Sequence, residues 1–557
     1  MMGRYTKSIF IFLFVIICSR PLTAQPFTHA DSLRGGYGPS RNWWNATKYD
    51  LHVKFNINDS SISGWNEISY KVIKKGSLLQ IDLQAPLILD SIQFETSSIY
   101  AKPFRKTYSK KDIRKDGYAY FINVPNNGSV ADNSIKVYYH GKPRVAKRAP
   151  WDGGVVWTKD QAGNPWITIA CQGLGASVWY PCKDSQADEP DSAAMHITIP
   201  DSLMAVGNGR FRGKTDNNDG TASFDWAVIN PINNYNIIPY IGKYTHFGEV
   251  YDGENGKLDM DYWVLDSNLS KAKEQFKDAP RMMKAFEYWF GPYPFYEDGF
   301  KLVDAPHLGM EHQSAVAYGN KYLNGYLGKD LSGSGWGLKW DYIIIHESGH
   351  EWFANNITTK DIADMWVQEG FTTYSEVLFT EYFYGKQAAD EYLVGLRKRI
   401  NNNGPIVGKY GVNNEGSGDM YSKGASIIHT IRQAINNDSL FRQILRGLNK
   451  TFWHQTVTTK QVEDYISKQS KINFSKIFNQ YLRTALIPVL EYKQNGFNLS
   501  YRYTNCITGF NLPLRINFKG ERWIKPSPKW KTLKLYPEGD SSFSADPNFY
   551  INTKKLD

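Results

Sequence analysis

Several features that this 557-residue sequence lacks narrow the class of protein it can encode. Beyond the N-terminus, no apolar stretch reaches the roughly 18 residues that a transmembrane helix needs, so we expect no transmembrane segment. The 65 Lys and Arg residues outnumber the acidic ones, with a formal charge of +10, but they are scattered along the chain. This distribution argues against nucleic-acid binding. Internal repeats and low-complexity tracts are also absent from the sequence, so we expect globular domains.

Cysteine is scarce as well, with 4 residues in the whole chain. Cys18 belongs to the N-terminal segment considered next, which leaves Cys171, Cys182 and Cys506 in the remainder. An odd number of cysteines excludes a fully paired disulfide framework. A Cys171–Cys182 bridge would be compatible with an oxidising compartment, and the sequence leaves that question open.

Residues 1–24 have the features of a cleavable signal peptide. A basic start precedes an apolar core over residues 9–18, too short to cross a bilayer, and the small residue Ala24 follows. The alternative is a lipoprotein signal ending at Cys18, which fits poorly because a bulky residue precedes that cysteine. We therefore predict export to the periplasm or the extracellular space, with a mature chain that begins near Gln25.

The chain is longer than one hydrophobic core needs, and its patterns divide it into three parts. Residues 26–265 contain alternating strands such as residues 49–57, with turn signals such as residues 126–128, which predicts an all-β sheet or sandwich domain. Residues 266–487 have mainly helical spacing, and residues 488–557 return to strand patterns. The predicted fold class is multidomain α+β.

The helical part allows predictions about where individual helices begin and end. A helix that begins at Lys271 should end at the Gly-Pro-Tyr-Pro sequence, because Gly and Pro cannot continue it. Apolar residues between Trp340 and Ala354 predict a second helix, and residues 365–384 predict a third. Asp364 is placed to cap this third helix.

The central motif is a pair of histidines with a glutamate beside the first one. His346 and His350 are four residues apart, so on a helix they share one face and can bind one zinc ion. Glu369, after eighteen further residues, is the expected third ligand, which leaves one position for water. Glu347 is placed to take a proton from the zinc-bound water and pass one to the leaving amine. Glu376, two turns after Glu369, is placed to orient a ligand histidine.

The sequence HESGHEWF followed by WVQEGFTTYSE resembles the HExxH-x18-E pattern of gluzincins. It is the pattern of the aminopeptidase N and leukotriene-hydrolase family of zinc metallopeptidases. The resemblance is strongest over residues 172–184 and 291–424. It implies a saddle-shaped N-terminal β domain, a thermolysin-like catalytic domain over residues 266–487 with one zinc ion per chain, and a small C-terminal β domain.

Two other segments resemble substrate-binding motifs of that family. LGMEHQ is similar to its Gly-Ala/Gly-Met-Glu-Asn motif on an edge strand, which implies that Gly309, Met310 and Glu311 bind the peptide. Glu311 would supply the negative charge for a free amino group. Gln172 matches a position that helps to hold the same amine. His312 replaces the usual Asn, and the sequence does not show whether it contacts substrate.

Tyr421 lies in YSKG, which resembles the family's Tyr-x-Lys-Gly segment at the start of a helix. Its hydroxyl would stabilise the oxyanion that forms when water attacks the peptide carbonyl. Such an interaction is worth roughly 3–4 kcal/mol.

Together these residues predict a zinc-dependent aminopeptidase that removes N-terminal residues from peptides with a free N-terminus. One alternative is an endopeptidase with the same zinc chemistry, in which Glu311 would have no amine to bind. Another is an inactive relative that only binds peptides, which would need a broken zinc site. The oligomeric state and the preferred N-terminal residue are not readable from the sequence.

Overall fold

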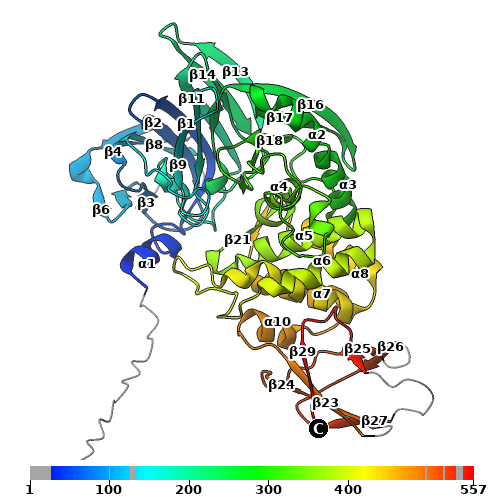
Figure 1. The fold of residues 1–557 in the computed structure, drawn as a ribbon. Coiled ribbons are helices and arrows are strands. Elements are labelled where there is room, and N and C mark those ends of the chain that lie inside the picture. The colour runs from blue at the N-terminus through cyan, green and yellow to red at the C-terminus, as the bar shows by residue number, and fades with distance from the viewer. Residues whose placement is uncertain (1–26, 99–100, 126–131, 496–497, 518–520, 535–542) are drawn as a thin grey trace, which may run out of the picture.

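The computed structural model describes residues 27–98, 101–125, 132–495, 498–517, 521–534 and 543–557. The predicted signal peptide and the predicted turn at residues 126–128 lie outside the described residues. Figure 1 shows a β-rich part, a helical part and a small second β-rich part in succession along the chain. The predicted multidomain α+β fold is confirmed. Within the described ranges, no helix combines the length and apolarity that a membrane crossing requires.

A large twisted sheet dominates the N-terminal part, which begins with helix α1 (His29–Gly35). The strand order of this eight-stranded sheet is β13 (Arg210–Asp216), β14 (Thr221–Val228), β11 (Ser192–Pro200), β1 (Trp44–Asn56), β2 (Ser61–Val72), β8 (Asp132–Gly141), β4 (Ile88–Ser98) and β5 (Ala101–Tyr108). Two smaller sheets accompany it: β12 (Met204–Val206), β15 (Tyr240–Gly242), β10 (Pro165–Ala170) and β9 (Gly154–Lys159), and β3 (Leu78–Asp82), β7 (Ala119–Asn123) and β6 (Arg114–Asp116).

Strand β1 shows why this region folds as a one-sided sheet. Tyr49, Leu51 and Val53 are buried in the N-terminal core, whereas the alternate residues Asp50 and His52 face outward and are half-buried. The period of two matches the alternation that predicted a strand. β1 pairs with β2 in the antiparallel sense and with β11 in the parallel sense, so it joins segments that are distant in sequence.

A five-stranded mixed sheet connects the N-terminal part to the helices. Its order is β16 (Tyr244–Gly253), β17 (Gly256–Leu265), β18 (Phe300–Asp304), β20 (Val316–Tyr318) and β19 (Gly309–Met310). β17 ends at Leu265, the predicted end of the N-terminal domain, and β18 lies after it. Because the two strands pair, one sheet spans this predicted boundary. The two-residue strand β19 lies at the edge.

The helical part packs around a buried pair of helices, α4 and α5, and Figure 1 places α4 between the five-stranded sheet and α5. Its helices are α2 (Leu269–Gln275), α3 (Asp278–Phe290), α4 (Tyr342–Gly349), α5 (Trp366–Tyr384), α6 (Lys386–Leu396), α7 (Ser422–Ile435), α8 (Asp438–Thr451), α9 (Thr459–Ser470) and α10 (Ser475–Leu482). The short strands β21 (Ile357–Thr359) and β22 (Gln455–Val457) pair beside them.

Two predictions about helix limits need correction or refinement. The helix predicted from Lys271 is two helices, α2 and α3, although it does end at Gly291 as predicted. The α-helix predicted to reach Ala354 ends at Gly349, and a π-helical turn over Glu351–Asn356 follows, in which Phe353 and Ala354 leave helical geometry.

Asp364 does not cap α5, and that prediction was wrong. Met365 is the N-cap residue and provides no side-chain hydrogen bond. The Asp364 carboxylate instead accepts hydrogen bonds from the hydroxyls of Tyr410 and Thr459, which belong to other segments. Tertiary partners have therefore replaced the local cap.

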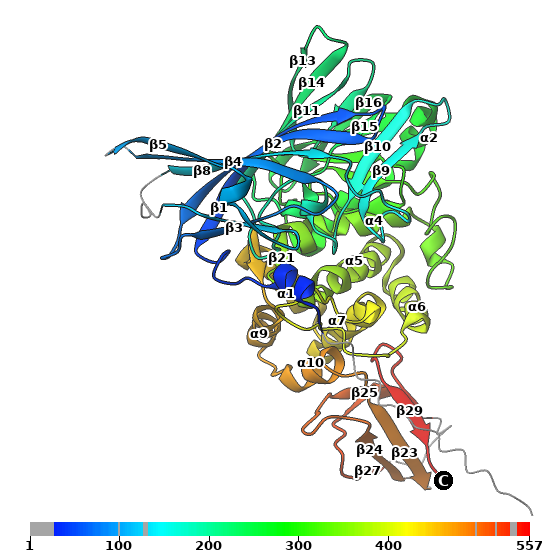
Figure 2. The same ribbon diagram turned by 90° about the vertical axis from the view of Figure 1, so that its left-hand side faces the viewer.

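The C-terminal part is a small β region, as predicted, and it contains two small sheets. One has the order β27 (Lys531–Lys534), β24 (Asn498–Thr504), β23 (Val489–Asn495) and β29 (Asn552–Lys555), and the other β26 (Glu521–Ile524), β25 (Leu514–Asn517) and β28 (Ser544–Ala545). Figures 1 and 2 show them beyond α10, at the opposite end from the large sheet. Their buried residues join the core of the helical part.

The structure also shows whether the three described cysteines are paired. Cys171, Cys182 and Cys506 are all free thiols, and the first two are buried. The bridge that the sequence left open is therefore not formed.

Candidate metal and peptide site

The histidine pair is carried by a short helix inside the molecule. Asp341 begins α4 by accepting hydrogen bonds from the backbone N–H groups of Ile343 and Ile344. This cap fixes the start of the helix, and His350 is its C-cap residue. His346 and His350 are thus held one turn apart on a helix whose apolar residues are buried.

Helix α5 brings a carboxylate to the two imidazoles. Glu369 Oε2 lies 3.4 Å from His350 Nε2 and 3.7 Å from His346 Nε2. All three side chains are buried, and their donor atoms form one group that could hold a metal ion. In tetrahedral zinc sites with bonds of about 2.0–2.1 Å, the donor atoms lie about 3.3–3.4 Å apart. Glu369 Oε2 is buried and accepts no hydrogen bond from the described residues, as expected for an atom placed to bind a cation. The residues present therefore fit zinc.

Neighbouring side-chain and backbone groups fix the orientation of both rings. His346 Nδ1 lies 2.6 Å from Glu376 Oε1, and the hydroxyl of Tyr392 donates to the other Glu376 oxygen at 2.6 Å. His350 Nδ1 lies 3.1 Å from the carbonyl oxygen of Phe353 and 3.0 Å from the hydroxyl oxygen of Thr372. With both Nδ1 atoms engaged, both Nε2 atoms are left to face Glu369.

Glu347 lies between this cluster and the edge strand β19. Glu347, Glu311 and His350 each offer an atom within 4.8 Å of the others. Burial raises the pKa of the Glu347 carboxyl to about 7, against the lowering effect of the two histidines. Gly309 of β19 packs on this carboxylate, because a Cβ atom there would lie 2.8 Å from Glu347 Oε1. Gly309 is therefore needed for close packing against Glu347.

Glu311 is held by side chains from the N-terminal part. The Gln172 amide donates to Glu311 Oε1 at 2.5 Å, and the Tyr235 hydroxyl donates to the same oxygen at 3.0 Å. Asn355 donates to the Glu311 backbone carbonyl at 2.9 Å. Both side-chain bonds end on Oε1, so Oε2 remains for a ligand. Burial raises the pKa of Glu311, and His350 opposes that effect.

Tyr421 stands directly before α7, as predicted, with its ring centroid 6.2 Å from that of His346. Its side chain is 37 % exposed and borders the pocket. Two glycines bring this segment close to Glu369. A Cβ at Gly424 would lie 2.8 Å from the Gly370 Cα, and one at Gly370 would lie 3.1 Å from the Gly424 Cα. Larger residues there would separate α5 from α7.

His312 has no part in the pocket. It is fully buried, its Nδ1 lies 2.5 Å from the Tyr240 hydroxyl oxygen, and burial holds its pKa well below the usual value. The neighbouring Met310 does line the pocket. His312 lies beyond the end of β19, so the alternation of that strand does not govern its position.

The predicted metal-binding, catalytic and substrate-binding residues all line one pocket of about 560 Å³. Its residues from distant segments, which the sequence did not reveal, are Trp151, Tyr326, Tyr342, Arg399 and Glu415. Tyr235, Tyr392 and Thr372, which contact the predicted site residues, were also missed. A tyrosine or threonine has no spacing signal that would connect it to a histidine in another segment.

Residues 274–481 match the model of the peptidase family M1 domain. The chain carries an M1 domain. This confirms the family that the sequence resembles, since the similar proteins include a leukotriene A-4 hydrolase and aminopeptidases. The match includes both zinc-cluster helices and Tyr421.

Curated relatives of the M1 chain are distant in sequence. It is 21 % identical over 341 residues to leukotriene A-4 hydrolase of Xenopus laevis, covering 57 % of this chain and 52 % of that protein. It is 21 % identical over 507 residues to a Sulfurisphaera tokodaii protein named "Probable aminopeptidase 1", covering 86 % and 59 %. It is 26 % identical over 239 residues to human aminopeptidase B, covering 42 % and 33 %. The chain thus spans about half the length of the first two.

Solved structures show the same fold. An M1 zinc metallopeptidase from Deinococcus radiodurans, a mutant bound to a Tyr-Ser-Ala substrate, superposes with a TM-score of 0.65 at 18 % identity. The alignment covers 81 % of this chain and 96 % of that one. A second structure of the enzyme gives 0.63, with coverage of 79 % and 93 %.

Proposed function

We propose that this M1 chain is a zinc aminopeptidase that hydrolyses the first peptide bond of substrates with a free N-terminus. The observation that carries the proposal is one pocket in which a zinc-type donor set lies beside a second, separate carboxylate. His346, His350 and Glu369 would hold one catalytic zinc ion, and Glu311 lies beyond Glu347 at the wall formed by β19.

The charges in the pocket support two cationic ligands. Four carboxylates lie close together in and beside the metal cluster, those of Glu311, Glu347, Glu369 and Glu376. The metal-cluster side chains include only two imidazoles that could offset this negative charge. Buried carboxylates are costly unless positive charge accompanies them. A metal cation at Glu369 and a substrate ammonium at Glu311 would meet that need at two ends of one pocket.

The chain's own residues supply the remaining chemistry. When bound, zinc would activate a water molecule and polarise the scissile carbonyl. Glu347 accepts the proton of the attacking water and returns it to the leaving amine. The Tyr421 hydroxyl donates to the developing oxyanion. Glu311 accepts hydrogen bonds from the substrate ammonium, with Gln172 holding the Glu311 carboxylate in place, so that the first peptide bond reaches the reacting groups.

A peptide and its N-acetylated twin test the exopeptidase proposal. Because acetylation removes the charge that Glu311 would bind, we expect the free peptide to be cleaved and the acetylated one to resist. Glu311→Gln should raise KM and lower kcat on the free peptide. Equal cleavage of both peptides would instead establish the endopeptidase alternative. A metal-free protein that binds peptides without cutting them would establish the inactive one.

We also propose export, on the evidence of residues 1–24 in the sequence. Protein recovered from the periplasm or the medium should have an N-terminus near Gln25, determined by N-terminal sequencing. Recovery of an uncleaved chain from the cytoplasm alone would contradict export.

A further inference from the structure

A second group of metal-type side chains lies far from the pocket, on the outer face of the large sheet. Among the described residues, the groups with metal-ligating spacing are the two in the catalytic pocket and one formed by Asp50, His52 and His196. Asp50 and His52 are two residues apart on β1, so they share a face. His52 and His196 are direct partners in the parallel pairing of β1 with β11. The sheet register therefore brings the three together.

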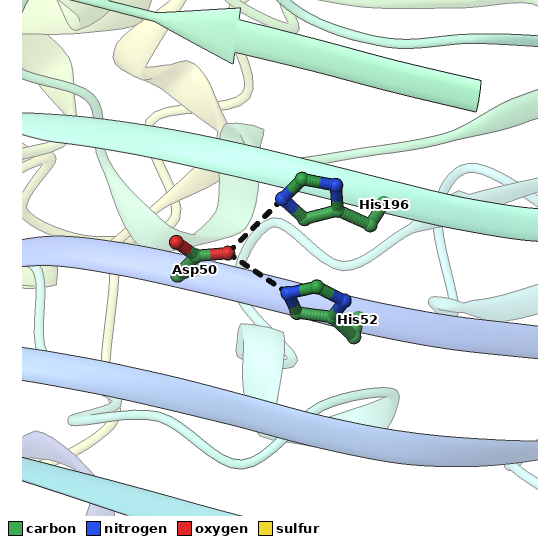
Figure 3. Close-up of side chains that lie close together, drawn as sticks. All are labelled: Asp50, His52 and His196. Atoms are coloured by element: carbon green, nitrogen blue, oxygen red, sulfur yellow. Dashed lines mark ion pairs between the residues drawn. The ribbon is translucent and has the colours of Figure 1, made fainter. Parts of the chain in front are cut away.

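The distances within this cluster match those of a metal site. Asp50 Oδ1 lies 3.2 Å from His52 Nε2 and 3.1 Å from His196 Nε2, and Figure 3 shows both ring nitrogens converging on that carboxylate. Donor atoms around zinc lie about 3.3–3.4 Å apart, close to these distances. An ion would bind once the two stacked rings rotate to direct both Nε2 lone pairs at it. Asp50 Oδ1 is buried at the atomic level, yet no contact to it has hydrogen-bond alignment. This oxygen is therefore the point at which both imidazoles and a shared cation would meet.

Surrounding residues orient the donors. His196 Nδ1 lies 2.7 Å from Asp225 Oδ1, which leaves Nε2 as the metal-binding nitrogen. The His52 ring is stacked between two others, with centroids 4.5 Å from Trp65 and 4.0 Å from His196. Lys48 contacts the other Asp50 oxygen, Oδ2, at 2.8 Å and leaves Oδ1 free of its ammonium.

We propose that Asp50, His52 and His196 form a second zinc site that clamps β1 to β11. This would raise the zinc content from one ion per chain to two. Two imidazoles and one carboxylate favour zinc and its transition-metal neighbours over magnesium or calcium. The side chains retain about 30 % exposure, so water can complete the coordination and the ion can exchange with solvent. The ligands come from strands about 145 residues apart in sequence, so the ion binds only when the two strands are paired. Its binding therefore stabilises the folded sheet.

The test measures zinc per chain after gel filtration with a defined excess of free Zn²⁺. Wild type should hold two ions, and His52→Ala and His196→Ala one each, with unchanged peptidase activity. His346→Ala should lose the other ion, so the sheet site is scored even if the proposed catalytic function fails. His246→Ala is the matched control, because His246 also sits on a strand, contacts a carboxylate at 2.8 Å and lies against a tryptophan ring, but lacks a second histidine. It should keep both ions.

Three outcomes would overturn the site: one zinc in wild type, two in both His52→Ala and His196→Ala, or equal loss in His246→Ala. If the alanine variants fold poorly, judged by circular dichroism in chelator, His52→Gln replaces them and should also hold one ion. A crystal of wild type grown with Zn²⁺ gives an independent answer from anomalous diffraction at the zinc edge. We expect a peak between Asp50 Oδ1 and the two Nε2 atoms, and a flat map there would refute the proposal.

Discussion

The molecule contains two clusters with the same donor types, two histidines and one carboxylate, in opposite settings. In the helical cluster, His346, His350 and Glu369 are 5, 1 and 3 % exposed. In the sheet cluster, the side chains of Asp50, His52 and His196 are 27, 35 and 31 % exposed. Water can screen the second cluster when it is empty, whereas the first holds a buried carboxylate whose free energy depends on nearby positive charge. Burial would therefore distinguish the proposed catalytic ion, held tightly, from the proposed structural ion, which could exchange with solvent.

Stepwise chelation should give the largest contrast between the clusters. We expect the exposed sheet ion to leave at low chelator strength with little change in activity. Removal of the buried ion should then abolish peptidase activity. Metal content and turnover measured on the same samples check this order. Activity that falls in proportion to the first ion lost would reverse the assignment.

Glu347→Gln should lower kcat by about 10²–10⁴-fold, since it removes the proposed general base while keeping the size of the side chain. Zinc content should stay at the wild-type value, because Glu347 is not among the three donors. His52→Ala serves as the comparison, with full activity and one ion fewer. A Glu347→Gln enzyme with near-normal turnover would eliminate the proposed mechanism.

Glu376→Gln tests whether the carboxylate behind His346 matters for metal binding by the helical cluster. It replaces the carboxylate that lies 2.6 Å from His346 Nδ1, and such changes cost about 10–100-fold in metal affinity or activity. Competition with a zinc chelator and steady-state kinetics measure the two quantities. Wild-type affinity and activity would mean that ring orientation does not depend on this contact.

Gly309→Ala should have a smaller effect on catalysis. The new Cβ would press on Glu347 Oε1, the end of a side chain that can move, so we expect kcat to fall about tenfold with zinc unchanged. Gly404→Ala is the control, since nothing lies within 4 Å of its Cβ position. Equal rates for both variants would show that Glu347 tolerates displacement.

Asp225→Asn should give the smallest effect, as the exposed counterpart of the Glu376 change. It weakens the partner of His196 Nδ1, and we expect zinc affinity at the sheet cluster to drop about tenfold or less. Catalysis should not change. Calorimetric titration of Zn²⁺ into protein whose catalytic site is already loaded measures this affinity. A loss of zinc affinity as large as that caused by Glu376→Gln would contradict the contrast between the clusters.

Local spacing was enough to identify much of the helical cluster. Two histidines four residues apart share a helix face by geometry alone, and Glu376 lies two turns beyond Glu369 for the same reason. The family resemblance then supplied positions such as Glu311 and Tyr421, which the structure places at the same pocket. Strand alternation likewise predicted the β-rich parts.

What only the tertiary structure decided was which distant segments meet. Thr372 of α5 contacts the His350 ring only because α4 and α5 pack against each other. Tyr235 reaches Glu311, and His196 reaches His52, only after the chain has folded. A sequence records periodicity along one element, because helix and strand geometry are local. It does not record the pairing of remote elements, because that depends on packing and sheet register throughout the molecule.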